Sequence, residues 1–168
     1  MNIKRLLRLL TFGITVLIIL SCFFIFSLAQ VVGHSMMPTI KDEQWIVTNQ
    51  LSYFFIEPRR GDVVLIEQNG AQYVKRVIGL PEETIEIKNQ QLYIDGTPYA
   101  QRFITDSSSF WTHDIPEIKI PDQAYYVLGD NRINSNDSRY SLGFIKASDI
   151  VGRAEFIIYP FTDWQVIH

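Results

Sequence analysis

From Trp45 onward the chain is a succession of short runs rich in valine, isoleucine, tyrosine and phenylalanine, separated by turn signals. The runs read DVVLIEQ, QYVKRVIG, ETIEIKN, QLYIDG, AYYVLGD and RAEFIIYP. Such runs are typical of β-strands, and this part of the sequence has no helical period over three turns. With 168 residues, 47% of them hydrophobic, the chain can bury a modest core. The sequence therefore predicts one mostly antiparallel β domain.

Two dipeptides predict where neighbouring strands pair. Asn69-Gly70 joins DVVLIEQ to AQYVKRVIG, and Asp95-Gly96 follows QLYI. Asn-Gly and Asp-Gly are the dipeptides preferred in two-residue hairpin turns. The first hairpin places Lys75 on a strand paired with its predecessor, where a lysine has two interpretations. Its stem can cover apolar surface while the ammonium reaches water, or the amine can be desolvated and serve as a base near neutral pH.

The first thirty residues form a separate segment. Leu9 to Ala29 is an uncharged run of 21 residues, preceded by Lys4, Arg5 and Arg8. A run of this length can cross a bilayer as a helix, and a basic flank favours a cytoplasmic amino terminus. The sequence predicts a cytoplasmic segment over 1–8, a transmembrane anchor over 9–29 and an extracytoplasmic domain over 30–168. The predicted location is the cell membrane, with a single span.

Three alternatives to an anchor apply to the same run. Ser27-Leu28-Ala29 has the small-x-small form of a cleavage site, so removal as a secretory signal, or self-cleavage after Ala29, stays open. Lipid attachment at Cys22 would need a small residue two positions upstream, where Leu20 stands. A buried core helix would need a larger protein around it. The anchor is the interpretation that the sequence favours.

Charge and composition exclude several classes of function. Residues 1–29 carry a net charge of +3, so the rest of the chain carries −6. An acidic domain has no electrostatic basis for binding nucleic acid. The single cysteine excludes an intrachain disulfide and a cysteine-based metal site. The three histidines, His34, His113 and His168, lack the spacing of metal ligands, so we expect no metal and no cofactor.

Ser35 lies in the stretch GHSMMPTI, residues 33–40, between a histidine and two methionines. A serine hydroxyl is a poor nucleophile unless a neighbouring group accepts its proton. Adjacent residues on an extended chain point to opposite faces, so His34 is badly placed for this role. A base for Ser35 must therefore come from elsewhere in the chain.

Four stretches in order resemble the conserved boxes of the type I signal peptidases, membrane-bound serine proteases that remove signal peptides from exported pre-proteins. They are GHSMMPTI, RRGDVVLI (59–66), YVKRVIGLP (73–81) and LGDNRINSNDSRYSLGFI (128–145). The resemblance implies an antiparallel, barrel-like β-sheet domain after an anchor, with a small second β subdomain near residues 82–122. It implies signal peptides and the lipid bilayer as partners.

The resemblance also implies roles for individual residues. Ser35 would be the nucleophile and Lys75 the general base. Ser135 would orient the lysine amine, and Asp137 and Arg139 would form a supporting ion pair. Asp130 and Arg132 match the rest of the Gly-Asp-Asn-Arg turn of the family.

The oxyanion hole and one turn depart from the family pattern. The backbone N–H of Ser35 is the expected oxyanion donor. Many relatives add a serine or threonine hydroxyl at the position of Gly33, so the second donor stays open here. Glu82 replaces a glycine of the family, so its turn must avoid a positive φ or tolerate strain.

Family members bind an extended substrate with small side chains at the first and third positions before the scissile bond. Side chains near the dyad are candidates to line the pockets for them, although each could equally be core: Val31, Met36, Ile40, Tyr73 and Val74.

Two other functions share these features. A non-catalytic signal-peptidase-like factor could assist the assembly of surface proteins, but it would be expected to lack a dyad residue. A self-cleaving repressor protease uses the same serine/lysine chemistry, but the predicted anchor speaks against it. We therefore expect a membrane-bound serine endopeptidase.

Overall fold

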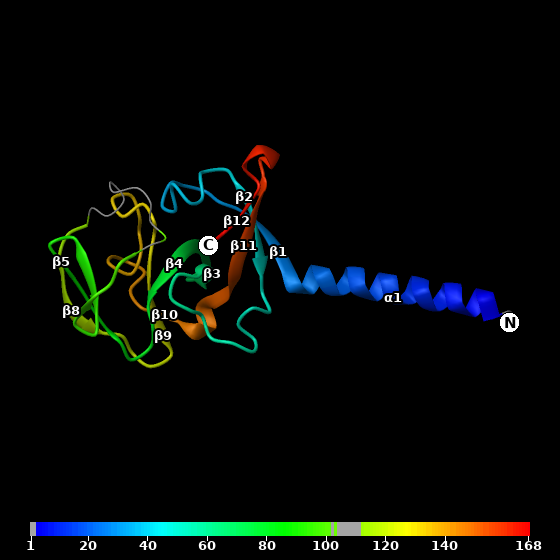
Figure 1. Cartoon of the computed structure of the whole chain (residues 1–168), viewed down its shortest axis with the longest axis horizontal. Helices are drawn as coiled ribbons and strands as arrows, with labels where there is room; N and C mark the ends of the chain where they lie inside the picture. The colour runs from blue at the N-terminus through cyan, green and yellow to red at the C-terminus, as the bar shows by residue number, and fades with distance from the viewer. Residues whose placement is uncertain (1–2, 102, 104–111) are drawn as a thin grey trace.

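The computed structural model describes residues 3–101, 103 and 112–168. It contains one long N-terminal helix, α1 (Ile3–Ile25), and two antiparallel sheets. Figure 1 shows α1 running away from the sheets, with the smaller sheet on the opposite side of the molecule. The fold is mostly β and antiparallel, as the strand-like runs predict.

The larger sheet has eight strands. Its order is β1-β2-β11-β3-β4-β9-β10, with β12 paired to β11. Its strands are β1 (Phe26–Gln30), β2 (Trp45–Asn49), β3 (Val63–Gln68), β4 (Ala71–Gly79), β9 (Ala124–Leu128), β10 (Ile145–Lys146), β11 (Ile150–Tyr159) and β12 (Gln165–Val166). Two 3₁₀ turns flank β11, η2 (Ala147–Asp149) and η3 (Phe161–Asp163).

The smaller sheet has four strands in the order β7-β6-β5-β8. These are β5 (Thr84–Lys88), β6 (Gln91–Ile94), β7 (Thr97–Pro98) and β8 (Ile115–Lys119). Its buried side chains form a core cluster that also takes in residues of β4 and β9: Ile78, Ile85, Ile87, Leu92, Ile94, Ile120, Tyr126 and Leu128. The two sheets therefore meet along β9 and the C-terminal part of β4.

Both predicted hairpins are confirmed. Gln68 pairs with Ala71 across Asn69-Gly70, and Ile94 pairs with Thr97 across Asp95-Gly96. All four turn residues have positive φ, between 48° and 75°. That is the backbone geometry of the hairpin turns for which these dipeptides are selected.

The strand β3 shows why the larger sheet is buried on both faces. Val63 packs in a cluster with Met36, while its neighbour Val64 packs in another cluster with Val127. Successive strand residues point to opposite faces, so a strand buried on both faces reads as a continuous apolar run. Burial of each such side chain contributes about 1.5–3 kcal/mol. This packing fixes β4, the strand that carries Lys75, at the centre of the domain.

The predicted transmembrane anchor over residues 9–29 is wrong. In the part of the chain that the structure describes, no helix is long and apolar enough to span a membrane. The helix α1 ends at Ile25, and the last residues of the apolar run, from Phe26 to Ala29, belong to β1 and pair with β2. The backbone of this segment is therefore committed to the sheet. The predicted cell-membrane location, with a cytoplasmic amino terminus and an extracytoplasmic catalytic domain, is overturned with the anchor.

Glu82 tolerates strain instead of avoiding it, since its φ is 68°. Its side chain forms an ion pair of 2.7 Å with Lys119, but both groups are largely exposed, so the pair contributes little. Glu82→Gly should therefore raise the free energy of unfolding by about 1 kcal/mol, because glycine adopts this conformation without a Cβ clash. Urea unfolding measures the change. The matched control Glu86→Gly, within β5, should lower the free energy of unfolding by about 0.5–1 kcal/mol. If Glu82→Gly also lowers the free energy of unfolding, the backbone at Glu82 is not strained.

Candidate active site

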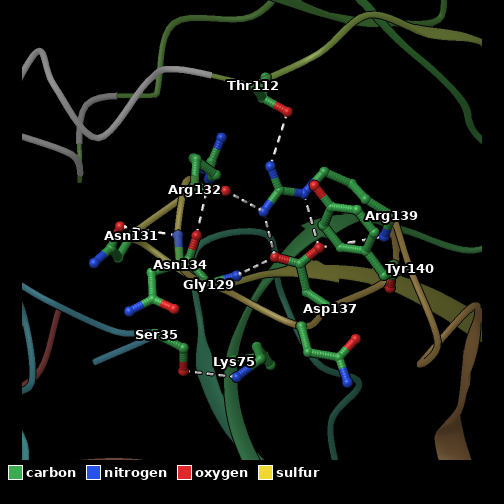
Figure 2. Close-up of polar contacts among 12 residues, drawn as sticks. Ser35, Lys75, Thr112, Gly129, Asn131, Arg132, Asn134, Asp137, Arg139 and Tyr140 are labelled. Carbon is green, nitrogen blue, oxygen red and sulfur yellow. Dashed lines mark hydrogen bonds and ion pairs between the residues drawn. The ribbon is translucent and has the colours of Figure 1, made fainter. Parts of the chain in front are cut away.

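Ser35 and Lys75 lie in direct contact although 40 residues separate them. Ser35 is in the turn that follows β1, and Lys75 is in the middle of β4. The Lys75 Nζ donates to the Ser35 Oγ at 2.8 Å (Figure 2). It also donates to the Val74 carbonyl at 3.0 Å. A deprotonated amine in this place would be within reach of the hydroxyl proton. The structure thus brings together the serine and lysine that the sequence singles out.

Burial tunes the amine of Lys75. Lys75 is only 4% exposed. Desolvation lowers the pKa of Lys75 from 10.5 to about 8, against the opposing effects of the Asp137 and Asp130 carboxylates, which raise it. A group with a pKa of about 8 is deprotonated in roughly one molecule in ten at pH 7. Lys75 can therefore supply a neutral amine near physiological pH, which an ordinary lysine cannot.

A cavity of about 180 Å³ opens beside this pair. Its lining is Ala29, Gln30, Val31, Val32, Ser35, Leu65, Gln72, Tyr73, Val74 and Lys75. Val31, Tyr73 and Val74 are thus placed beside the dyad. Met36 and Ile40 are instead fully buried in the core cluster behind it.

Sequence reasoning missed the contribution of β1 to the cavity. Ala29 and Gln30 are its last two residues, and both line the cavity. Nothing in the sequence indicates that α1 ends before residue 29. Because the whole apolar run is assigned to a helix, no strand is predicted on this side of the cavity. Gln72, on β4, also lines the cavity; it lies three residues before Lys75, and the strand period of two would place it on the opposite face, so the predicted strand gave no signal for it.

Asp137 and Arg139 form a buried ion pair next to the dyad. Their side chains are 0% exposed, and the guanidinium donates to both carboxylate oxygens at 2.8 Å. Arg139 also donates to the Thr112 Oγ1 and to the Arg132 carbonyl, both at 2.8 Å. Asp137 accepts the Gly129 N–H at 3.0 Å (Figure 2). The pair thereby fixes the backbone of the loop after β9.

Asp130 forms a second buried ion pair, with Arg76. The Arg76 Nε and Nη2 donate to its two oxygens at 2.8 and 2.7 Å. Asp130 also accepts the Thr39 Oγ1 hydroxyl at 2.5 Å. Because Arg76 follows Lys75 and Thr39 belongs to the segment after Ser35, Asp130 ties the two halves of the dyad together. Sequence reasoning missed Arg76 and Thr39, although each stands in a motif with a dyad residue.

Ser135 is buried close to the nucleophile. Its Oγ has no hydrogen-bond partner among the described residues. Gly129 separates it from Ser35: a Cβ at Gly129 would lie 2.3 Å from the Ser135 Oγ and 2.4 Å from the Ser35 carbonyl oxygen. A glycine is therefore required here for the loop to approach the nucleophile. Arg132, also buried, donates to the Gly129 carbonyl at 2.9 Å.

Gly33 has a backbone conformation that explains why the residue is glycine. Its φ is +102°, which L side chains rarely adopt, even though a Cβ there would meet no atom within 4 Å. Its N–H donates to the Asp42 Oδ1 at 2.7 Å. By contrast, the Ser35 N–H has no hydrogen bond to any residue that the structure describes. Of these two N–H groups, only that of Ser35 is available to a ligand.

No ring of the three histidines contacts Ser35 or Lys75 in the described hydrogen bonds. His34, His113 and His168 all have exposed side chains. The His34 carbonyl oxygen accepts a hydrogen bond from the Asn131 side chain. The His34 ring makes no hydrogen bond to Ser35 among the described contacts. The titratable side chain in contact with Ser35 is that of Lys75.

Comparisons with known proteins agree with this geometry. The model of the family "Signal peptidase, peptidase S26" matches residues 3–159. The chain is 40% identical over 150 residues to signal peptidase I S of Bacillus subtilis (strain 168), covering 84% of this chain and 82% of that protein. It is 36% identical over 147 residues to a signal peptidase I of Bacillus amyloliquefaciens, covering 83% and 80%.

A solved structure is also similar. A crystal structure of a signal peptidase I from Enterococcus faecalis V583 matches with a TM-score of 0.51 at 32% identity. The match covers 58% of this chain and 96% of that chain. Since the family model spans almost the whole sequence and the relatives match it over most of their own lengths, the chain belongs to the signal peptidase family, peptidase S26, whose serine protease activity removes signal peptides from pre-proteins.

Proposed function

We propose that Ser35 is the nucleophile and Lys75 the general base with which this chain removes signal peptides. The observation that carries the proposal is the 2.8 Å contact between the Lys75 Nζ and the Ser35 Oγ. The contact lies on a cavity, and burial lowers the pKa of the amine to about 8. An activated serine next to a neutral amine is the arrangement that acyl transfer requires.

The reaction proceeds through an acyl-enzyme. The neutral Lys75 amine takes the hydroxyl proton as the Ser35 Oγ attacks the carbonyl carbon of the scissile bond. The resulting ammonium gives that proton to the nitrogen of the leaving group, the C–N bond breaks, and an ester to Ser35 remains. The amine then removes a proton from water, whose oxygen attacks the ester carbon, and the proton returns to Ser35 as the signal peptide leaves.

The surrounding residues hold this pair in place. Asp130, Asp137 and Arg139 fix the loop after β9 through two buried ion pairs. We assign the orientation of the lysine amine to Ser135: its buried hydroxyl bonds neither to Lys75 nor to any other described residue, so it is left free to accept a hydrogen bond from the ammonium. The Ser35 N–H donates to the oxyanion of the tetrahedral intermediate. Gly33 provides the backbone conformation before Ser35 but no side-chain donor.

The substrate is a pre-protein whose signal peptide is cut after small side chains. The cavity of about 180 Å³ is smaller than the roughly 300–1,000 Å³ of typical ligand pockets, which favours small residues beside the scissile bond. Val31, Tyr73 and Val74 line this cavity and would set its shape. Met36 and Ile40 do not line the cavity. They are core residues that pack against Val31 and Val74 in its wall and so support that wall.

Residues 30–168, together with the rest of β1 (Phe26–Gln30), form the catalytic unit, with residues 82–122 inserted as a small β subdomain. The four strands β5 to β8 make a sheet of their own within this range. Both dyad residues and the ion pairs lie outside it. We therefore assign the chemistry to the larger sheet and its loops.

Cleavage of a purified pre-protein tests the proposal. The wild-type chain should release the mature protein after a small-x-small sequence, identified by N-terminal sequencing of the product. Ser35→Ala should abolish release, since no oxygen remains to form the ester. The matched control Ser148→Ala alters an exposed serine of η2 and should cleave like the wild type. Equal cleavage by Ser35→Ala and the wild type would overturn the proposal and favour a non-catalytic factor.

A further inference from the structure

The peptide unit between His34 and Ser35 carries the proposed oxyanion donor at one end and a carbonyl oxygen at the other. A trans peptide is planar, so its N–H and C=O point in opposite directions. The His34 carbonyl accepts the Asn131 Nδ2 at 3.1 Å and the Met37 N–H at 3.2 Å. Whatever holds this oxygen therefore also sets the direction of the Ser35 N–H.

Asn131 holds the next peptide unit as well. Its backbone N–H donates to the Ser35 carbonyl at 3.0 Å. Its side-chain Oδ1 accepts the Asn134 N–H at 3.3 Å, which turns the Nδ2 towards His34. Figure 2 shows Asn131 and Asn134 on the loop beside Ser35. Asn131 thus donates hydrogen bonds to the carbonyls of both His34 and Ser35.

These hydrogen bonds from Asn131 matter because few of the described groups at the site can donate to an oxyanion. Gly33 supplies no side-chain hydroxyl, and its N–H is already bonded to Asp42. The Ser35 N–H is therefore the proposed donor that remains, and a donor contributes only if it is aimed at the place where negative charge develops. Loss of its aim would not be compensated by a hydroxyl at position 33.

We propose that Asn131 is a positioning residue for the oxyanion hole: its side-chain amide aims the Ser35 N–H by anchoring the His34 carbonyl. This inference rests on the proposed function, because it assigns the Ser35 N–H to the intermediate. Asn131 does not touch the substrate carbonyl itself. It acts through the peptide unit between His34 and Ser35.

Kinetics of Asn131 variants test the inference. Asn131→Asp keeps the size of the side chain and the acceptor for Asn134, but places an oxygen that cannot donate against the His34 carbonyl. We expect kcat for pre-protein cleavage to fall about 10- to 100-fold, with KM within about twofold, because the lost interaction acts in the transition state. Asn131→Ala should give a similar loss. The matched control Asn136→Ala, at an exposed asparagine of the same loop, should leave both parameters unchanged.

An inhibitor series separates positioning from a general loosening of the loop. A peptide aldehyde with the sequence of the cleavage site forms a hemiacetal with Ser35 and so places an oxygen in the hole. Its affinity should fall in Asn131→Asp by the same factor as kcat/KM, while that of the matching peptide alcohol should not change. Asn131→Gln, which keeps a donor, should recover part of kcat.

The outcomes distinguish this inference from the proposed function. Wild-type kcat in Asn131→Asp, a loss confined to KM, or equal losses for aldehyde and alcohol would overturn the role of Asn131. Should Asn131→Ala fail to fold, the thermal midpoint and kinetics of Asn131→Asp and Asn131→Gln decide the question. Failure of the wild type to cleave, or cleavage by Ser35→Ala, would instead refute the proposed function.

Discussion

Lys75→Met is expected to abolish cleavage and at the same time to stabilise the fold at neutral pH. Methionine fills a similar volume but cannot accept a proton, so Ser35 loses its base. Burial lowers the pKa of Lys75 from 10.5 to about 8, and each unit corresponds to about 1.4 kcal/mol. Removing the buried ammonium should therefore raise the free energy of unfolding at pH 7 by up to about 3 kcal/mol, less the contribution of the two hydrogen bonds that are lost.

The gain should depend on pH in a defined direction. Between pH 8 and 10.5 the unfolded chain binds more protons at Lys75 than the folded chain, so wild-type stability rises with pH across this window. Below pH 8 the buried Lys75 ammonium destabilises the fold by its full amount, and above pH 10.5 it no longer does so because the amine is neutral in both states. The stability difference between Lys75→Met and the wild type should therefore shrink as the pH rises from 8 to 10.5.

Urea unfolding at a series of pH values, together with cleavage assays, measures both effects. The matched control is Lys88→Met, at an exposed lysine of β5, which should keep activity and change the free energy of unfolding by no more than about 0.5 kcal/mol. A variant that loses activity but is also less stable at pH 7 would show that Lys75 is not a desolvated base. Such a gain in stability with a loss of activity is typical of active-site residues.

The strands and hairpins could be predicted from the sequence because their signals are local. Asn69-Gly70 determines the β3–β4 register, and the run that follows it carries Lys75. The motifs also singled out Ser35 and Lys75, which the fold then brings to 2.8 Å. Hydrophobic periodicity and turn preferences depend on a few neighbouring residues, so strands and hairpins can be predicted from them without knowledge of the tertiary structure.

The contacts between distant segments could not be predicted in this way. Asn131 lies 97 residues after His34, and no spacing rule relates an amide to a particular carbonyl at such a distance. Met36 and Val31 have the same apolar character in the sequence, yet only Val31 faces the cavity. The end of α1 was missed for a related reason. Phe26 to Ala29 are as apolar as the helix before them, and only pairing with β2 makes them a strand.

Asp137→Asn should weaken the fold and shift the pH dependence of cleavage, and the two effects have different causes. The side chains of Asp137 and Arg139 are fully buried. An asparagine is nearly the same size but leaves the guanidinium without its counter-charge, which costs about 3–5 kcal/mol. Arg139→Met added to this variant removes the uncompensated charge, so the double variant should be more stable than Asp137→Asn alone.

The shift in pH dependence follows from the neighbours of Lys75. Burial lowers the pKa of Lys75 to about 8, and the Asp137 carboxylate is the largest effect opposing it. Without that negative charge the ammonium is less favoured, and the pKa of Lys75 should fall below 8. The acidic limb of kcat/KM reports this group in the free enzyme. Its midpoint, about pH 8 in the wild type, should therefore move to lower pH in Asp137→Asn and in the double variant.

The exposed Asp122, in the turn before β9, provides the control. Asp122→Asn should change neither the urea midpoint nor the acidic limb. A stability loss in Asp137→Asn without a shift of the limb would mean that the carboxylate acts only through the loop that it holds. A shift to higher pH would contradict the assignment of the limb to a lysine, because removing a neighbouring negative charge always favours the neutral amine. The direction of the shift thus tests whether Lys75 is the base, independently of its replacement.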